Sequence, residues 1–131
     1  MAKAQEDKQQ IGLTATGDEA LQVLLADGRF ANQTDAYRFA ISFAIAADLD
    51  LADAPQGGYN TKFNARGTLE SGSSIRDLIE ILGIGEANRP FATAEKLAEL
   101  GVKEIARRLE GNESLADIMT EVSRSHSSGV R

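Results

Sequence analysis

Residues 36–47 constrain the fold most, because they are predicted to form a helix that is apolar on nearly every side. The sequence continues without a helix breaker to Leu49, and three capping residues precede it. A helix that is apolar nearly all round must be buried nearly all round. One chain of 131 residues has little material for this, so we expect a homodimer in which a second copy covers the helix. The expected dimer core consists of Phe39, Ala40, Phe43 and Ala44.

The segment before this helix predicts a strand and a short helix. Apolar and polar residues alternate over residues 10–16, which is typical of a short, half-buried strand. Asp18 is a good N-cap for a helix that reaches about Ala26, and Gly28 is its natural terminator. The order strand, helix, helix thus occupies about residues 10–49.

The remainder predicts a second strand followed by helices. Residues 59–66 alternate again, with aromatic side chains on one face and polar ones on the other. Helical spacing then continues to the C-terminal region, with expected starts at Ser73 or Ser74 and at Asn112, and with stops at the glycines Gly83, Gly85, Gly101 and Gly111. The expected fold class is α+β, mostly helical: an N-terminal strand-helix-helix unit, a second short strand, and a C-terminal module of three or four helices.

Polarity gives the expected domain boundaries. Residues 1–9 and 125–131 are polar without an apolar period, so we expect a disordered arm and a disordered tail. Between them we expect a dimerisation unit over residues 10–49 and a strand plus helical module over residues 50–124.

The amino-acid composition makes several kinds of catalytic and metal site unexpected. The chain has no cysteine, and its one histidine, His126, lies in the polar tail, so thiolate and histidine sites are not expected. We therefore predict no enzyme activity, no metal and no cofactor. No apolar run approaches the roughly 18 residues of a membrane span, and the N-terminal residues lack the apolar region of a signal peptide. A cytoplasmic protein without a membrane partner is expected.

The runs QIGLTAT, DEALQVLLADG and NQTDAYRFAISFAIA resemble a ribbon-helix-helix half-unit of the Arc and Met repressor class. The resemblance implies that two chains pair their first strands into a ribbon that enters the major groove of DNA. It places Gln10, Gly12 and Thr14 at the base-reading positions, and Asn32, Gln33 and Thr34 where a helix start contacts phosphate. Ribbons of the family usually carry an outward Arg or Lys, whereas this one has Gln and Thr.

A fainter resemblance covers most of the chain. The runs GRFANQTDAYRFA, TKFNARGTLE and EKLAELGVKEIARRL are similar to small proteins associated with bacterial phage-defence and DNA-modification gene clusters. This resemblance implies a defence or mobile-element setting and supplies no catalytic motif.

The second strand carries the other candidate nucleic-acid contacts. Lys62 and Arg66, with Asn60 and Asn64 on the same face, suit phosphate contact, and Arg89 is a candidate to join them. The alternative is that these polar residues form an ordinary solvated strand face, while the aromatic residues of the opposite face lie in the core. The chain has 14 Lys and Arg against 20 Asp and Glu, a net charge of −6, so any contact with nucleic acid must be local.

Two functions follow from these patterns. The first is a small, non-catalytic DNA-binding regulatory protein that acts as a dimer. The alternative is a protein–protein adaptor or accessory subunit of a larger complex, without direct DNA contact; the acidic balance of the chain favours this.

Overall fold

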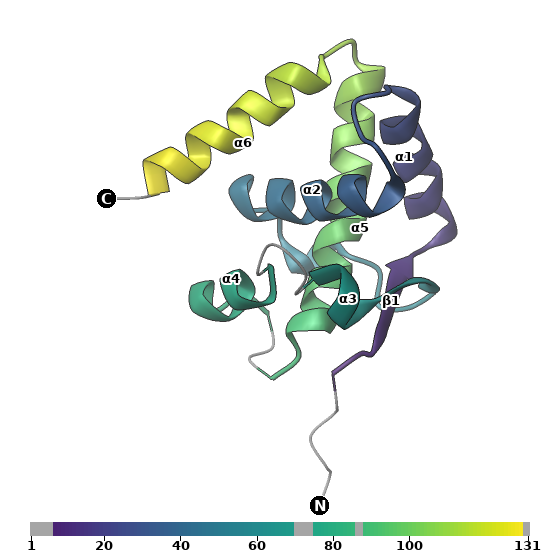
Figure 1. Ribbon diagram of the computed structural model, residues 1–131, viewed down its shortest axis with the longest axis vertical. Coiled ribbons are helices and arrows are strands. Elements are labelled where there is room, and N and C mark those ends of the chain that lie inside the picture. Colours follow the sequence, from purple (N-terminus) through teal and green to yellow (C-terminus); the bar gives the residue numbers. More distant parts are fainter. Residues whose placement is uncertain (1–6, 70–74, 86–87, 130–131) are drawn as a thin grey trace, which may run out of the picture.

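One long helix runs through the molecule, and the other elements pack around it (Figure 1). The computed structural model describes residues 7–69, 75–85 and 88–129. The long helix is α5, Pro90–Glu110; α2, Gln33–Ala46, crosses it, and α1, Ala15–Ala26, lies beside it. The remaining elements are β1 Gln10–Leu13, η1 Leu51–Asp53, β2 Asn60–Asn64, α3 Ala65–Leu69, α4 Ile75–Leu82 and α6 Leu115–Gly129. This arrangement confirms the predicted α+β, mostly helical fold class.

The apolar helix α2 is buried within a single chain. Ala36, Ala40 and Ala44 are completely buried on it, and Phe43 is only 2% exposed. The expectation that one chain could not cover this helix is therefore wrong, because α5 and its neighbours do so. The residues predicted for a dimer core belong to the core of the chain itself, with Phe39 at its edge, half-buried against Phe30.

A glycine in α5 permits this close crossing. A Cβ atom on Gly101 would lie 2.1 Å from the carbonyl oxygen of Ala40, so no larger residue fits. Gly101 was predicted to end a helix, and that prediction is wrong: α5 continues through it to Glu110. Gly101 serves helix packing instead.

The sheet has two antiparallel strands from the same chain. Ile11 pairs with Phe63 and Gly12 with Thr61, so Lys62 is the extra residue of a bulge. The element order strand, helix, helix expected from the ribbon-helix-helix resemblance is present as β1, α1 and α2. However, β1 pairs with β2 of its own chain, whereas the resemblance implies pairing with β1 of a second chain. Gly12 is required at this point, since a Cβ atom on it would lie 1.7 Å from the carbonyl oxygen of Asn60.

Several element ends differ from the predicted ones. Thr14, and not Asp18, caps α1, and its hydroxyl accepts a hydrogen bond from the Gly17 N–H at 3.1 Å. The start of α6 is likewise not capped by Asn112: the Ser114 hydroxyl accepts from the Asp117 N–H at 3.1 Å. Both helices are thus capped by a hydroxyl residue that was not predicted as the cap.

The two ends of the chain also differ from the predicted domain boundaries. Asp7 and Lys8, in the segment expected to be a disordered arm, are hydrogen-bonded to α5, and α6 continues to Gly129 within the expected tail. The predicted caps Ser73 and Ser74 lie outside the described residues. Within the described ranges, no helix is both long enough and apolar enough to cross a membrane.

Candidate functional site

Two buried carboxylates of α5 bind the backbone at the edge of β1 that faces away from β2. Glu95 is 3% exposed and accepts from the Gly12 N–H at 2.9 Å. Glu99 is completely buried and accepts from the Thr14 N–H at 3.0 Å and from its hydroxyl at 2.6 Å. Residues four apart rise about 6 Å along a helix, and residues two apart rise about 6.6 Å along a strand. The two spacings match, so the two carboxylates act in place of a third strand.

Cations and a tyrosine complete this buried network. Glu95 is ion-paired with Lys8, and Glu99 with Lys103 at 2.7 Å. The Tyr37 hydroxyl donates to the Gly12 carbonyl at 3.0 Å. Burial raises the pKa of Tyr37 well above 10, and the nearby Glu95 and Glu99 charges add to the effect. These carboxylates are thus engaged with backbone and cation donors, which is the environment of structural groups rather than of a general acid and base.

The segment before β1 is fastened to the start of α5. The Asp7 carboxylate accepts from the Phe91 N–H at 2.8 Å and from the Ala92 N–H at 2.9 Å. These N–H groups belong to the first turn of the helix, where a negative charge also interacts favourably with the helix dipole. Asp7 is therefore an N-cap supplied from a distant part of the sequence, and it positions Lys8 beside Glu95.

Lys8 lies between two clefts, which we call the tyrosine cleft and the arginine cleft. The tyrosine cleft has a volume of about 480 Å³ and is lined by Lys8, Gln56, Gly57, Gly58, Tyr59, Arg89, Ala92, Glu95 and Lys96. The arginine cleft has a volume of about 630 Å³ and is lined by Asp7, Lys8, Gln9, Asn64, Arg66 and Phe91. Because Lys8 belongs to both linings, the clefts adjoin at the N-terminal end of α5.

The two clefts are richer in cations than the chain as a whole. Together their linings hold the four cations Lys8, Arg66, Arg89 and Lys96 against the two carboxylates Asp7 and Glu95. Both carboxylates are engaged in the bonds described above. Lys8 is itself ion-paired with Glu95, and the two linings together hold two more cations than carboxylates on a chain of net charge −6.

Tyr59 is the aromatic residue of the tyrosine cleft. Its hydroxyl donates to the Pro55 carbonyl at 2.9 Å, and the Lys8 ammonium lies 5.4 Å from the ring centre. Its pKa is raised above 10, first by burial and then by the charges of Glu99 and Glu95. The hydrogen bond to Pro55 holds the ring in place, and burial keeps its hydroxyl protonated to a higher pH than that of an exposed tyrosine.

The residues predicted to read bases, and most of those predicted to contact phosphate, do not line either cleft. Gln10 is exposed, Gly12 is buried, and Thr14 is bonded to Glu99. Asn32 caps α2 by accepting from the Asp35 N–H at 2.9 Å, and neither it nor Gln33 nor Thr34 lines either cleft. Lys62 is ion-paired with Asp18 at 2.8 Å.

Of the residues predicted to contact nucleic acid, Asn64 and Arg66 line the arginine cleft, and the additional candidate Arg89 lines the tyrosine cleft. Sequence reasoning missed Lys8, Lys96 and the exposure of Tyr59 to a cleft. A signal for Lys96 was present, because Arg89, Ala92 and Lys96 are spaced by three and four residues and so share one face of a helix.

Comparison of the chain with known protein families, curated proteins and solved structures gave no match. The described residues also contain no group of three or more His, Asp or Glu side chains placed to hold a metal ion. The geometry of the clefts is therefore the basis for the function proposed below.

Proposed function

We propose that this protein is a non-catalytic DNA-binding protein that contacts the DNA backbone through the tyrosine and arginine clefts. The observation that supports the proposal is the excess of cations over carboxylates in the linings of the two adjoining clefts, four against two, on a chain of net charge −6. Phosphate contacts supply most of the sequence-independent affinity of proteins for DNA.

The other polar residues in the clefts suit the same ligand. The amide side chains Gln9, Gln56 and Asn64 line the clefts between the cations. Amide side chains commonly bind phosphate and sugar oxygens alongside Arg and Lys. Because the positive surface is local, we expect moderate affinity that falls steeply with salt.

This proposal differs from the DNA-binding mode implied by the ribbon-helix-helix resemblance. Gly12 and Thr14 are bonded to Glu95 and Glu99, so groove reading by β1 is not part of it. The clefts are formed by one chain, and the proposal does not depend on the predicted homodimer. The cytoplasmic location and the defence or mobile-element setting stay predictions that suit a DNA-binding protein.

The test is the salt dependence of DNA binding. Fluorescence anisotropy with a labelled oligonucleotide is measured from about 50 mM salt upward for the wild type and for the double variant Arg66→Gln/Lys96→Gln. Loss of two phosphate contacts should weaken binding and reduce the slope of log K against log salt by about 1.5.

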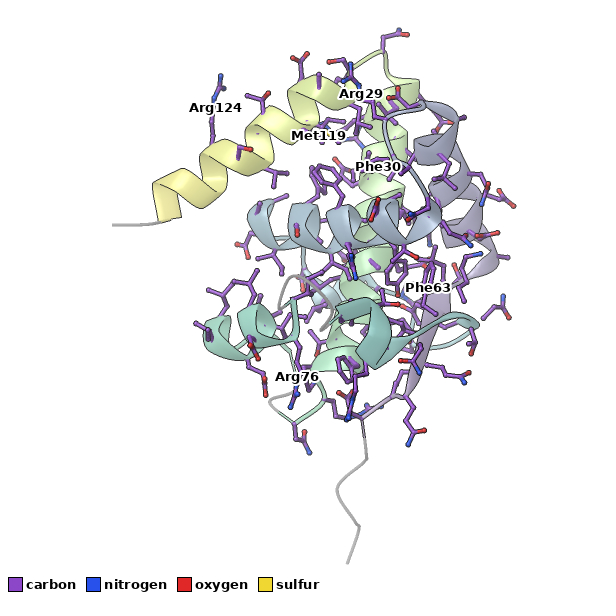
Figure 2. All side chains as sticks on the ribbon, viewed as in Figure 1. Arg29, Phe30, Phe63, Arg76, Met119 and Arg124 are labelled. Atoms are coloured by element: carbon purple, nitrogen blue, oxygen red, sulfur yellow. The ribbon has the colours of Figure 1, made fainter. Side chains whose placement is uncertain are left out.

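A matched control removes two cations elsewhere. Arg107 and Arg124 are exposed, and Arg124 projects from α6 away from the body of the molecule (Figure 2). The double variant Arg107→Gln/Arg124→Gln should keep the wild-type slope. Absence of binding to any oligonucleotide at low salt, or an equal loss in both double variants, would contradict the proposal.

A second candidate, the adaptor function, is favoured by a different observation. On α4, Ile81 is 80% exposed and Leu82 is 52% exposed, whereas Ile75 and Ile79 of the same helix are buried. Contiguous exposed apolar patches are typical of surfaces that bind another protein, and these two side chains would be the centre of such a patch. A second copy of the chain would be one such partner, which would give the predicted homodimer a different interface.

Site-specific crosslinking tests this second candidate. A photoreactive amino acid at position 81 should give a discrete adduct in cells, and Leu82→Gln should reduce its yield. A doubled mass would indicate self-association, and another mass would indicate a partner protein. No discrete adduct would count against the adaptor function.

A further inference from the structure

We infer that the tyrosine cleft holds one unpaired nucleobase and that the protein therefore prefers single-stranded to double-stranded DNA. This inference rests on the proposed DNA-binding function and deepens it, because it names the form of DNA that is bound. Its evidence is the shape of the cleft and the placement of Tyr59, which the charge argument does not use.

The cleft has room for a base. Its volume of about 480 Å³ lies within the roughly 300–1,000 Å³ of small-molecule sites. One wall is the segment 56–59, in which two glycines lack side chains. A Cβ atom on Gly57 would have no atom within 4 Å, so this wall borders open space. Gly58 has φ +87°, a conformation that disfavours a larger residue there.

Tyr59 provides the stacking surface. Its hydrogen bond to the Pro55 carbonyl holds the ring, so little conformational freedom is lost when a base stacks on it. Burial and the nearby carboxylates raise the pKa of the Tyr59 hydroxyl, so the ring stays uncharged to a higher pH than that of an exposed tyrosine. Base stacking on aromatic side chains is the sequence-tolerant contact that single-strand-binding proteins use.

The cations of the same cleft lie where flanking phosphates would pass. Arg89 directly precedes α5 and Lys96 lies in its second turn, so the two cations are roughly 10 Å apart along the helix axis. The Lys8 ammonium adds a third charge and lies over one face of the Tyr59 ring, 5.4 Å from its centre, so the base would stack on the other face. In a duplex both faces of each base are stacked, so a base would have to leave the helix to reach Tyr59, at a cost in free energy.

Three probes separate base stacking from charge. The first is an oligothymidylate of about twelve nucleotides, the second a strand with the same number of phosphates but no bases, and the third a duplex of the same length. We expect the oligothymidylate to bind at least about ten-fold more tightly than the base-free strand. It should also bind more tightly than the duplex at equal salt.

Variants then assign the difference to the tyrosine cleft. Tyr59→Leu should lose most of the advantage of the oligothymidylate, whereas Tyr59→Phe, which keeps the ring, should retain it. Gly57→Leu adds a side chain to the lining of the cleft, at a position where a Cβ atom would meet no other atom within 4 Å, and should hinder entry of the base. Circular dichroism melting establishes whether each variant is folded. If Tyr59→Leu does not fold, Gly57→Leu decides whether a base binds in the tyrosine cleft.

Intrinsic fluorescence gives an independent signal. The chain has two tyrosines and no tryptophan, so a base that stacks on Tyr59 should quench a large share of the tyrosine fluorescence of the protein. The base-free strand should cause no such quenching. Equal affinity for the oligothymidylate and the base-free strand would overturn the inference and leave the proposed backbone binding intact. Absence of binding to all three probes would overturn both.

Discussion

Gly101 of α5 lies directly on the backbone of Ala40 in α2, where a Cβ atom would approach the Ala40 carbonyl oxygen to 2.1 Å. Ala36, Ala40 and Ala44 on one helix and Ala94 and Ala98 on the other are completely buried nearby. Small side chains on both helices allow their axes to approach closely. The apolar helix that seemed to require a second chain is therefore buried by a single one.

The first prediction concerns this crossing. Gly101→Ala should lower the free energy of unfolding by about 2 kcal/mol, because the new methyl group meets backbone atoms that cannot move separately. Alanine is about 1 kcal/mol better than glycine inside a helix, and the overlap should outweigh this gain. Urea denaturation measures the change.

The control for this variant is Gly111→Ala at the end of the same helix. A Cβ atom on Gly111 would lie 3.5 Å from the Arg107 carbonyl oxygen, an ordinary contact. Its effect should stay within about 0.5 kcal/mol. A Gly101→Ala variant as stable as the wild type would show that the helices do not cross as described.

The second prediction concerns the carboxylate that binds Thr14. Glu99→Gln should destabilise the fold by about 2–4 kcal/mol, because the amide turns a donor toward groups that are themselves donors. It also leaves the Lys103 ammonium without its partner. Chemical denaturation measures the loss.

Glu104→Gln is the matched control for Glu99→Gln. Glu104 lies on the same helix and is paired with the exposed Arg107. Exposed pairs contribute about 0–1 kcal/mol, so this variant should unfold near the wild-type midpoint. Equal effects of the two variants would contradict the structural role of Glu99.

The third prediction is a dependence of stability on alkaline pH. The pKa values of Tyr37 and Tyr59 are raised above 10 in the folded state, so the unfolded chain releases these protons first as pH rises. The stabilisation is complete below about pH 10 and is lost above it. Tyrosinate absorbance should therefore appear together with the loss of helical circular dichroism.

Tyr59→Phe supports the assignment by removing one of only two tyrosines. The absorbance change should fall to about half and should still accompany unfolding. Ionisation of Tyr37 near pH 10 in a protein that remains folded would refute the burial described for this residue.

The fourth prediction concerns the N-cap supplied by Asp7. Asp7→Ala should cost about 1 kcal/mol and should speed amide hydrogen exchange at Phe91 and Ala92, whose N–H groups lose their acceptor. Gln9→Ala, an exposed neighbour, should change neither quantity. Unchanged exchange at Phe91 in Asp7→Ala would contradict the cap.

Local patterns predicted much of the fold. Alternation located β1 and β2 to within a few residues, and the cap of α2, Asn32, is one of the three capping residues predicted before that helix. The role of Gly101 was mistaken because a glycine that ends a helix and one that admits a neighbouring helix look alike in sequence. Only the position of Ala40 distinguishes them.

The candidate site was less predictable because it combines distant segments. Arg66 and Arg89 were named from the sequence, but Lys8, Tyr59 and Lys96 meet them only after folding. The pair Glu95 and Glu99 had a visible spacing of four residues, yet such pairs usually lie on exposed helix faces. Their burial depends on β1, more than 80 residues earlier in the chain.

The carboxylates at the outer edge of β1 also limit what other chains can do there. An unprotected strand edge is a template on which further strands add, and this is a common first step toward amyloid. Here Glu95 and Glu99 occupy the N–H groups of Gly12 and Thr14 that an incoming strand would need. The same contacts therefore prevent a further strand from adding at this edge of the sheet.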